Sequence, residues 1–510
     1  PSWRQKPRRS RGIIMSPVNA RCGTTPRKER NVTSTRFGRT VLCLLLVCAT
    51  AVAASSCGPV EVRPAKPAAR SLKTEGSGYR FESDGWTYLH VEGSPYEMGF
   101  QQGKLMAGDM DEVRKTSTHV FYHNSDLRWP HLAAAAEKLF AGKLGPDLEQ
   151  EIRGISEGAK AAGVDFPLAD VLALNGMIEL TGYWWPNVAS GKLPDVDAPT
   201  RCSAFLATGA YTSDGKPVMA HNTWSTYADA QFFNLITDMA PDRGHRILMQ
   251  SSPGLVHSAS DFFVTDAPLM GTETTISGIE TFDPEGTPEF VRARRAMQFA
   301  DSPDDFVRIM REGNNGGYAN SWLLANAKTG EIVRFEQGLE HDAVERTGSG
   351  YFVGFNGPSD PDLRNLETSG SGYFNLKDST CARRVRLEHL MKEHKGRIDL
   401  PAARAIIADH YDEYTREYEP GARTVEGRGD LDAREYTSGS PYNPAGAVDG
   451  KAMDAAGALK MSFQARWGSS SGMPFDAGEF LDKNPQYAFL KGYLRDRPPE
   501  PWVSFRAGMK

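Results

Sequence analysis

Cysteine is scarce in this chain of 510 residues, which contains only six. Four of the six lie within the first 57 residues: Cys22, Cys43, Cys48 and Cys57. The rest of the chain has Cys202 and Cys381, too few for a fold that is built on disulfides. A single Cys202–Cys381 bridge is the alternative to a chemical role for Cys202.

Positive charge is also lacking outside the N-terminal segment. Residues 1–57 hold eleven Lys and Arg residues against one acidic residue, Glu29, whereas the remainder holds 48 basic and 63 acidic residues. Nucleic-acid binding needs a basic face that attracts phosphate groups. The acidic body of the chain therefore excludes nucleic acid as the predicted partner.

Several common catalytic motifs are missing. The chain has no G-x-S-x-G nucleophile elbow, no papain-like spacing of Cys, His and Asn, and no zinc-type His spacing with a third ligand on one helix. We therefore predict neither a metal nor a cofactor.

The first 57 residues are typical of a targeting segment. Arg36 and Arg39 precede a short apolar run from Val41, and small residues then lead to Cys57. This order is the pattern of a secretory signal, and the run is short for a membrane span, the alternative interpretation. We predict export to the periplasm or cell surface, with Cys57 as a candidate lipid-attachment site that would tie the protein to a membrane.

The composition and the predicted secondary structure of the exported part change along its length. Residues 58–78 are rich in Pro, Ala and charge and are predicted to be a linker, and residues 79–201 are predicted to be mostly helical. Ser94 and Glu97 form a capping-box pattern at the start of the first long helix. Short strand patterns with turn signals dominate residues 202–510, between further helices. The fold class is therefore α+β, with helices layered on antiparallel sheets.

Cys202 lies at the junction between the helical front and the strand-rich body. A thiol of ordinary pKa needs a base to become a nucleophile. Cleavage between Arg201 and Cys202 would supply one, because the new α-amino group has a pKa near 8 and belongs to the same residue. We therefore predict autocleavage at this bond and a catalytic role for the Cys202 thiol.

The turn after the strand of Cys202 decides which groups come near it. A wide turn at Ala210–Gly215 places Cys202 opposite Asn222–Trp224, with His221 close by. A tight turn at Asp214 and Gly215 would place His221 across from Thr208 instead. Sequence alone leaves both registers open.

Four motifs in one order resemble the phospholipase B-like proteins, which are N-terminal-nucleophile (Ntn) hydrolases allied to bile-salt hydrolases and self-processing acyltransferases. The similarity runs from about Trp86 to Phe505. The motifs are "CSA" at Cys202, "HNTW" at His221, "TETTI" at Thr272 and "GGYANSW" at Gly316. The resemblance implies a four-layer αββα sandwich, a precursor that cleaves itself before Cys202, and Cys202 as the nucleophile.

The resemblance also implies further site residues. Asn320 matches the asparagine that stabilises the oxyanion, and His221 and Trp224 would line the pocket beside the thiol. Thr274 or Thr275 would face the site. The rival interpretation of His221 and Trp224 is packing in the core, and that of the threonines is strand filling.

Two choices remain open in the same comparison. Arg383 or Arg384 matches the active-site arginine, and Arg383 is favoured. Trp322 is a candidate substrate-binding residue or a packing residue.

These features together predict an exported acyl hydrolase that cleaves amide or ester bonds of lipid-like or N-acyl substrates through an acyl-Cys202 intermediate. The partner is thus a small molecule, and the oligomeric state is open. The alternatives are an acyltransferase with an amine acceptor and a non-catalytic surface lipoprotein that binds lipid.

Overall fold

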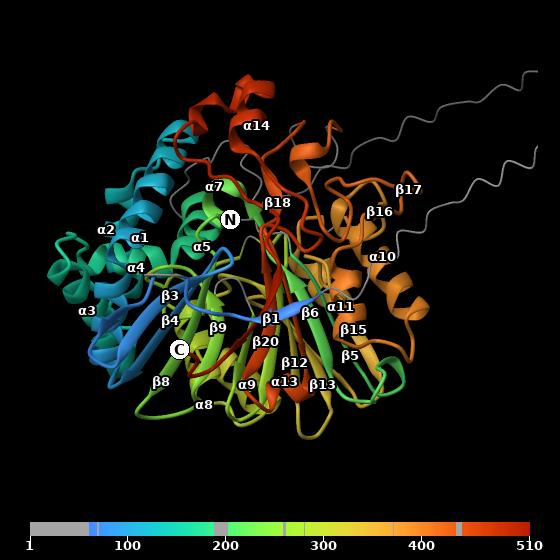
Figure 1. Ribbon diagram of the computed structural model, residues 1–510, viewed down its shortest axis with the longest axis horizontal. Helices are drawn as coiled ribbons and strands as arrows, with labels where there is room; N and C mark the ends of the chain where they lie inside the picture. Colours follow the sequence, from blue (N-terminus) through green and yellow to red (C-terminus); the bar gives the residue numbers. More distant parts are fainter. Residues whose placement is uncertain are drawn as a thin grey trace, which may run out of the picture. The chain divides into compact units, whose positions relative to one another are not determined.

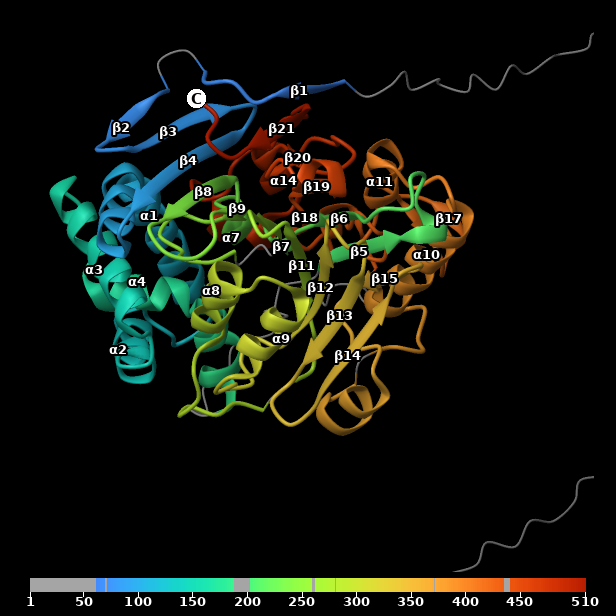
Figure 2. The ribbon, with the colours of Figure 1, turned by 90° about the horizontal axis from the view of Figure 1, so that it is seen from below.

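Two β-sheets lie between layers of helices in the computed structural model (Figure 1, Figure 2). It describes residues 61–68, 71–187, 202–258, 262–279, 281–370, 372–434 and 441–510, all of which belong to the unit Cys57–Lys510. The predicted targeting segment with Cys57, and Arg201 of the predicted cleavage site, lie outside the described residues.

The first sheet has seven strands. In spatial order they are β1 (Val62–Pro64), β21 (Trp502–Arg506), β20 (Ser462–Trp467), β19 (Asp449–Asp454), β6 (Val218–Asn222), β5 (Ser203–Thr208) and β15 (Gly350–Gly354).

The second sheet has ten strands. Their order is β14 (Asp342–Thr347), β13 (Ile332–Gln337), β12 (Asn320–Asn326), β11 (Leu269–Thr275), β10 (Phe262–Thr265), β9 (Ile247–Ser251), β8 (Leu235–Pro241), β4 (Trp86–Gly93), β3 (Gly78–Ser83) and β2 (Lys73–Glu75). Two further strand pairs join β16 (Tyr411–Asp412) to β17 (Glu417–Tyr418) and β7 (Trp224–Thr226) to β18 (Ala445–Ala447).

Helices cover the outer face of each sheet. The main helices are α1 (Pro95–Asn124), α2 (Trp129–Phe140), α3 (Pro146–Ala161), α4 (Leu168–Asn175), α8 (Glu289–Phe299), α9 (Pro303–Arg311), α10 (Ser379–Glu393) and α11 (Leu400–Ile407). The shorter ones are α5 (Met177–Glu179), η1 (Leu180–Trp184), α6 (Trp185–Asn187), α7 (Tyr227–Ala230), η2 (Gly209–Tyr211), η3 (Leu363–Glu367), η4 (Gly429–Leu431), α13 (Ala455–Ala458), α14 (Ala477–Lys483) and η5 (Pro485–Leu490). No helix in the described ranges combines the length and the apolar composition needed to cross a bilayer.

Three apolar clusters set the order of the layers. One cluster packs α1–α4, α8 and α9 against the ten-stranded sheet, and another packs α10 and α11 against the seven-stranded sheet. The third fills the space between the sheets, with Leu206 and Met219 from one and Leu323 and Met270 from the other. The layers are thus helix, sheet, sheet and helix, which confirms the predicted αββα sandwich.

The N-terminal part contributes more strands than its sequence suggested. Residues 58–78, predicted to be a linker, contain β1 and β2, and the predicted helical segment opens with β3 and β4. Two of the strand pairings are parallel rather than antiparallel, β4 with β8 and β1 with β21. An extended, proline-rich segment can pair through its backbone at a sheet edge, and its composition does not reveal this.

The start of α1 follows the sequence prediction. The Ser94 side chain accepts a hydrogen bond from the Glu97 main chain, and the Glu97 carboxylate accepts one from the Ser94 main chain at 2.9 Å. This capping box satisfies two main-chain N–H groups at the start of the helix, where no preceding helical turn offers a carbonyl acceptor.

Candidate active site

Cys202 is buried directly before β5, with 2% of its surface exposed. In the pairing of β5 with β6, Ser203 lies opposite Asn222 and Ala204 lies opposite His221. Continuing this register by one residue places Cys202 across from Thr223. The wide turn is therefore the one that the protein adopts, and β6 borders the candidate nucleophile.

Arg383 of α10 binds the main chain of the candidate nucleophile. Its guanidinium donates to the carbonyl oxygen of Cys202 and, at 3.2 Å, to Oγ of Ser203. The Arg383 side chain is fully buried. Of the two candidate arginines, Arg383 is thus the one at Cys202.

Arg384 points elsewhere. It donates to Glu388 at 2.9 Å, and its guanidinium lies 4.1 Å from the centre of the Tyr373 ring. Neighbouring positions on a helix are about 100° apart, so the two guanidinium groups reach different surroundings.

Trp224 lies beneath the site arginine. The guanidinium of Arg383 is 4.8 Å from the centre of its ring, a cation–π contact. The ring also packs closely against Gly427, where an added Cβ would lie 1.3 Å from Cζ2 of Trp224. Trp224, of which 4% is exposed, is therefore a packing partner that helps to fix the position of the Arg383 guanidinium.

Asn356 joins the two sheets beside Cys202, and the sequence analysis missed it. It follows β15, where Gly354 pairs with Ala204, so the continued register brings Asn356 alongside Cys202. Its Oδ1 accepts from Arg383 at 2.9 Å, and its Nδ2 donates to the carbonyl of Thr275 at 3.0 Å. The only signal was an Asn-Gly pair after a strand pattern, and the φ of +65° at Asn356 is one that asparagine tolerates.

Thr274 and Thr275 have different surroundings because successive side chains in β11 face opposite ways. A Cβ built on Gly354 would lie 2.6 Å from Cγ2 of Thr274 and 3.2 Å from Cβ of Ala204, so Thr274 faces the strand of the nucleophile. Its buried Oγ1 has no hydrogen-bond partner among the described residues. Thr275 faces away and donates to the Tyr318 hydroxyl at 2.9 Å.

Asn320 and Trp322 share one face of β12 but not one environment. Asn320 begins the strand opposite Thr275, and neither polar atom of its buried amide has a hydrogen-bond partner in the described part of the chain. Trp322 lies deeper and packs on Phe306, with ring centres 5.0 Å apart. Asn320 is thus at the start of the interior strand β12, on the same face as Thr275, whereas Trp322 belongs to the core beneath the helices.

His221 lies between the sheets, near a buried ion pair. Lys451 of β19 lies opposite His221 in the pairing of β19 with β6, and the Lys451 ammonium is 3.0 Å from the Asp449 carboxylate. Lys451 also donates to Oγ1 of Thr223 at 2.6 Å, and Asp449 accepts from the main-chain N–H of Thr223 at 2.9 Å. All three charged or titratable side chains, His221, Asp449 and Lys451, are fully buried.

These surroundings keep His221 neutral. Burial lowers the pKa of its imidazole well below the usual value, and the charge of Lys451 lowers it further, whereas the main-chain carbonyl of Glu273 acts in the opposite direction. A histidine with this pKa does not carry positive charge at neutral pH, and its neutral ring can only donate or accept hydrogen bonds.

Cys381, the other deep cysteine, is not bonded to Cys202. It lies in α10 and is buried, and burial raises the pKa of its thiol. The alternative of a Cys202–Cys381 bridge is therefore wrong. Among the described residues, no group of three or more His, Cys, Asp and Glu side chains gathers as metal ligands would.

Comparison with known proteins gives a family. The family model for Phospholipase B matches residues 168–495. Phospholipase B from Crotalus adamanteus is 26% identical over 309 residues, which cover 54% of this chain and 54% of that protein. An uncharacterized protein from Archaeoglobus fulgidus is 28% identical over 262 residues, which cover 48% of this chain and 42% of that protein.

Among solved structures, a mutant conjugated bile acid hydrolase from Clostridium perfringens is similar with a TM-score of 0.32 and 12% identity, covering 52% of this chain and 89% of that one. The chain spans about half the length of the curated relatives named above. The family match itself covers more than half of the chain and includes Cys202, His221, Asn320 and Arg383. The chain belongs to the phospholipase B family, as its motifs predicted.

Proposed function

We propose that the protein is a hydrolase that cleaves amide or ester bonds of lipid-like or N-acyl substrates through a thioester on Cys202. The observation that carries the proposal is the contact of Arg383 with the main chain of Cys202 and with Ser203. A fully buried guanidinium is costly unless it has partners, and here its partners surround one cysteine. Membership of the phospholipase B family supports the same class of chemistry.

The proposed reaction has two halves. The Cys202 sulfur attacks the acyl carbon of the substrate, and its proton passes to the α-amino group that cleavage after Arg201 releases. The alcohol or amine leaves with a proton, and the acyl group stays on sulfur as a thioester. Water then attacks the thioester, the acid leaves, and the thiol is restored.

Asn320 and Arg383 have different roles in the proposed reaction: Asn320 would stabilise the negative oxygen that develops in each half, and Arg383 would hold the nucleophile. The Asn320 amide has an N–H donor with no partner in the described part of the chain. This free donor and the family resemblance support the proposal that Asn320 donates to the substrate oxygen. Arg383 keeps its charge at every working pH and therefore holds the nucleophile in place rather than moving a proton.

The test combines processing and turnover. Denaturing electrophoresis and N-terminal sequencing of the purified protein should give two fragments, the second beginning at Cys202. Cys202→Ala should leave one uncleaved chain with no hydrolase activity on a soluble p-nitrophenyl ester. An active protein that mass spectrometry finds continuous across Arg201 and Cys202 would contradict the proposal.

Arg383→Lys and Arg384→Lys form a matched pair on neighbouring positions of α10. Lys at position 383 keeps the charge but loses the forked contacts, so we expect processing or turnover to fall on the order of a hundredfold. Lys at position 384 should leave both near the wild-type level. Equal losses of processing and turnover in the two variants would contradict the proposed role of Arg383 in holding Cys202.

Export and the lipid on Cys57 are also part of the proposal. They rest on the sequence of residues 1–57. N-terminal sequencing of the first fragment tests both, because a free terminus upstream of Val41 would show that the segment had not been removed.

A further inference from the structure

The peptide group that links Cys202 to Ser203 is held at both of its polar ends. Arg383 donates to its carbonyl oxygen, and its N–H, which belongs to Ser203, donates to Oδ1 of Asn222 at 3.2 Å. The C=O and N–H of a trans peptide point in opposite directions, so the two side chains reach it from opposite sides. The plane of this peptide group, and with it the Cα of Cys202, is therefore fixed.

The Asn222 amide is fully buried and uses its oxygen and its nitrogen for different partners. Its Nδ2 donates to the carbonyl of Ile407 at 3.0 Å and to that of Val425 at 3.2 Å, and Oγ of Ser470 lies 3.4 Å from the same nitrogen. Carbonyl oxygens can only accept, so they fix the nitrogen on their side and leave the amide oxygen for the N–H of Ser203. An asparagine is thus matched to this place.

The Asn222 side chain lies on the face of the seven-stranded sheet opposite to the thiol. Along β6 it shares a face with Val218 and Ala220, which pack with α10 and α11. Ala204 of β5 packs between the sheets, and Cys202, two residues earlier, falls on the same side because strand side chains alternate. The hold on the peptide group therefore comes from the helix layer and does not occupy the side on which the thiol lies.

One buried segment, residues 422–427, supports both side chains that hold the peptide group. Its Val425 carbonyl is an acceptor for Asn222. Its Ala422 carbonyl accepts from Oγ of Ser379 at 2.7 Å, and the same Oγ accepts from Nε of Arg383 at 3.0 Å. The positions of Asn222 and Arg383 therefore depend on one stretch of chain.

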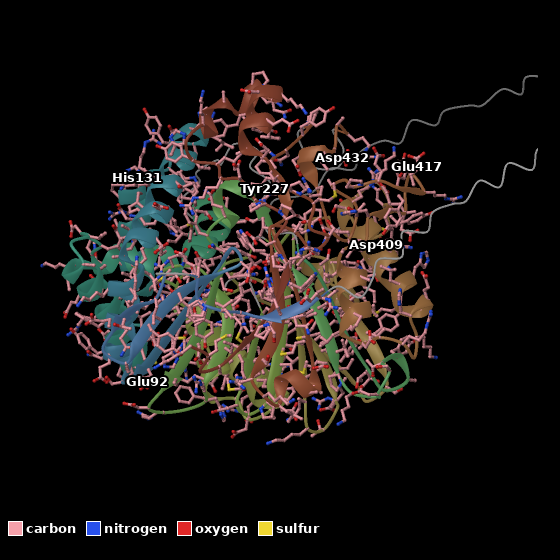
Figure 3. The ribbon with its side chains drawn as sticks, in the orientation of Figure 1. Glu92, His131, Tyr227, Asp409, Glu417 and Asp432 are labelled. Carbon is pink, nitrogen blue, oxygen red and sulfur yellow. The ribbon has the colours of Figure 1, made fainter. Side chains whose placement is uncertain are left out.

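Two aspartates fix this segment in turn. The N–H of Ala422 donates to the Asp432 carboxylate at 3.0 Å, and the N–H of Glu426 donates to the main-chain carbonyl of Asp409 at 3.1 Å. Figure 3 places Asp409 and Asp432 on the side of the molecule where α10 and α11 lie. The segment thus ties the helix layer to the strand that carries the nucleophile.

We propose that Asn222 is a positioning residue for the reaction at Cys202. It holds the N–H of the peptide group while Arg383 holds the carbonyl, and together they keep in one place the Cα that carries both the thiol and the amino group. This inference rests on the proposed function, because it takes Cys202 as the nucleophile. Displacement of a reacting atom by about 1 Å can slow a reaction on the order of a hundredfold.

Asn222→Ala removes the hold on the N–H, and Asn175→Ala is its matched control. Asn175 of α4 is also buried, and its Oδ1 accepts from the N–H of Val256 at 2.9 Å. Its Nδ2 donates to the carbonyls of Val171 and Gly254 at 2.9 and 3.0 Å. The same set of bonds is thus made in the helix layer of the other sheet, so the two variants should lose similar stability in urea unfolding.

Three rates separate positioning from folding in the full-length protein. They are self-cleavage after Arg201 during cell-free synthesis, acylation by a p-nitrophenyl ester, and alkylation of Cys202 by iodoacetamide, located by mass spectrometry. In Asn222→Ala we expect cleavage and acylation to fall about ten- to a hundredfold, because both need the sulfur aligned with an acyl carbon. Alkylation needs only the thiolate and should stay within about twofold of the wild type. Asn175→Ala should keep all three rates.

Asn222→Asp is the conservative variant, and it also covers the case in which Asn222→Ala does not fold. Its carboxyl keeps an oxygen for the N–H of Ser203. Burial among carbonyl oxygens favours the protonated form, which retains one donor. Cleavage and acylation should therefore stay within about fivefold of the wild type.

Several results would overturn the proposal. They are a folded Asn222→Ala with wild-type cleavage and acylation, equal losses of these rates in Asn222→Ala and Asn175→Ala, alkylation that falls as much as acylation, and a folded Asn222→Asp that has lost both reactions. Activity that depends on Cys202 but not on Asn222 contradicts the positioning role and leaves the hydrolase. Activity that persists in Cys202→Ala contradicts the hydrolase proposal itself, whatever Asn222→Ala does.

Discussion

The buried pair of Lys451 and Asp449 gives the sharpest energetic prediction. At 3.0 Å, two unit charges attract with about 5.5 kcal/mol when the effective dielectric constant is about 20. Lys451→Met removes the cation and leaves a carboxylate in a fully buried place, where Thr223 and Gln250 are its remaining donors. We expect this variant to lose about 3–5 kcal/mol of the free energy of unfolding.

The double variant Asp449→Asn, Lys451→Met removes both charges. Its free energy of unfolding should fall by far less than the sum of the losses in the two single variants. The assay is a double-mutant cycle on the midpoints of urea unfolding, followed by tryptophan fluorescence. A coupling energy below about 1 kcal/mol would refute the reasoning that the two charges compensate each other. Arg294 of α8 and Glu151 of α3, a second buried pair 2.9 Å apart, provide a comparison cycle in which a similar coupling energy is expected.

The same reasoning has an electrostatic consequence. Because Lys451 is one of the causes that lower the pKa of His221, Lys451→Met should raise that pKa, whereas Arg294→Met should not. Titration of the His221 ring signal by NMR measures the difference, and an unchanged pKa in Lys451→Met would contradict the assignment of cause.

Three further outcomes follow from packing and burial. Gly354→Ala should cost about 1–3 kcal/mol of the free energy of unfolding and lower activity, because the new Cβ would lie 2.6 Å from Cγ2 of Thr274. Gly348→Ala, in the connection between β14 and β15, has open space and should be neutral; equal unfolding midpoints for the two variants would contradict this. Burial raises the pKa of Glu179 from 4.5 to about 7. The protonated carboxyl therefore stabilises the fold fully below about pH 4.5, and the free energy of unfolding should fall by about 3 kcal/mol as the pH rises through 7. Glu179→Gln should remove this dependence of the melting temperature on pH, and equal pH dependence in wild type and variant would contradict the prediction. Trp322→Leu should lower the free energy of unfolding by about 2–4 kcal/mol and leave KM unchanged. A raised KM would show that this side chain belongs to the substrate pocket.

Much of the layout could be predicted from local signals. The capping box at Ser94 fixed the start of α1, and the change from helical to strand periodicity marked the position of Cys202. The order of four motifs indicated the family and, through it, the sandwich. These features depend on residues near one another in sequence or on a recognisable pattern.

The register and the facing of side chains could not be predicted in this way. Which turn follows β5 depends on how β6 packs between its neighbours, so the position of His221 was open until the pairing with Ala204 was known. The choice between Arg383 and Arg384 depends on the rotation of α10 against the sheet. Asn356 escaped notice because its importance comes from bridging Arg383 and Thr275, which lie on different elements.

The parallel pairing of β4 with β8 has a consequence for the timing of folding. Thr87 must find Leu235, about 150 residues later in the chain, before the ten-stranded sheet can close. Contacts at such separation form slowly, because a long loop must first be ordered. A nascent chain thus cannot complete this sheet until the segment beyond Cys202 has emerged, so the strands around Cys202 come together only in a chain whose later part has already been made.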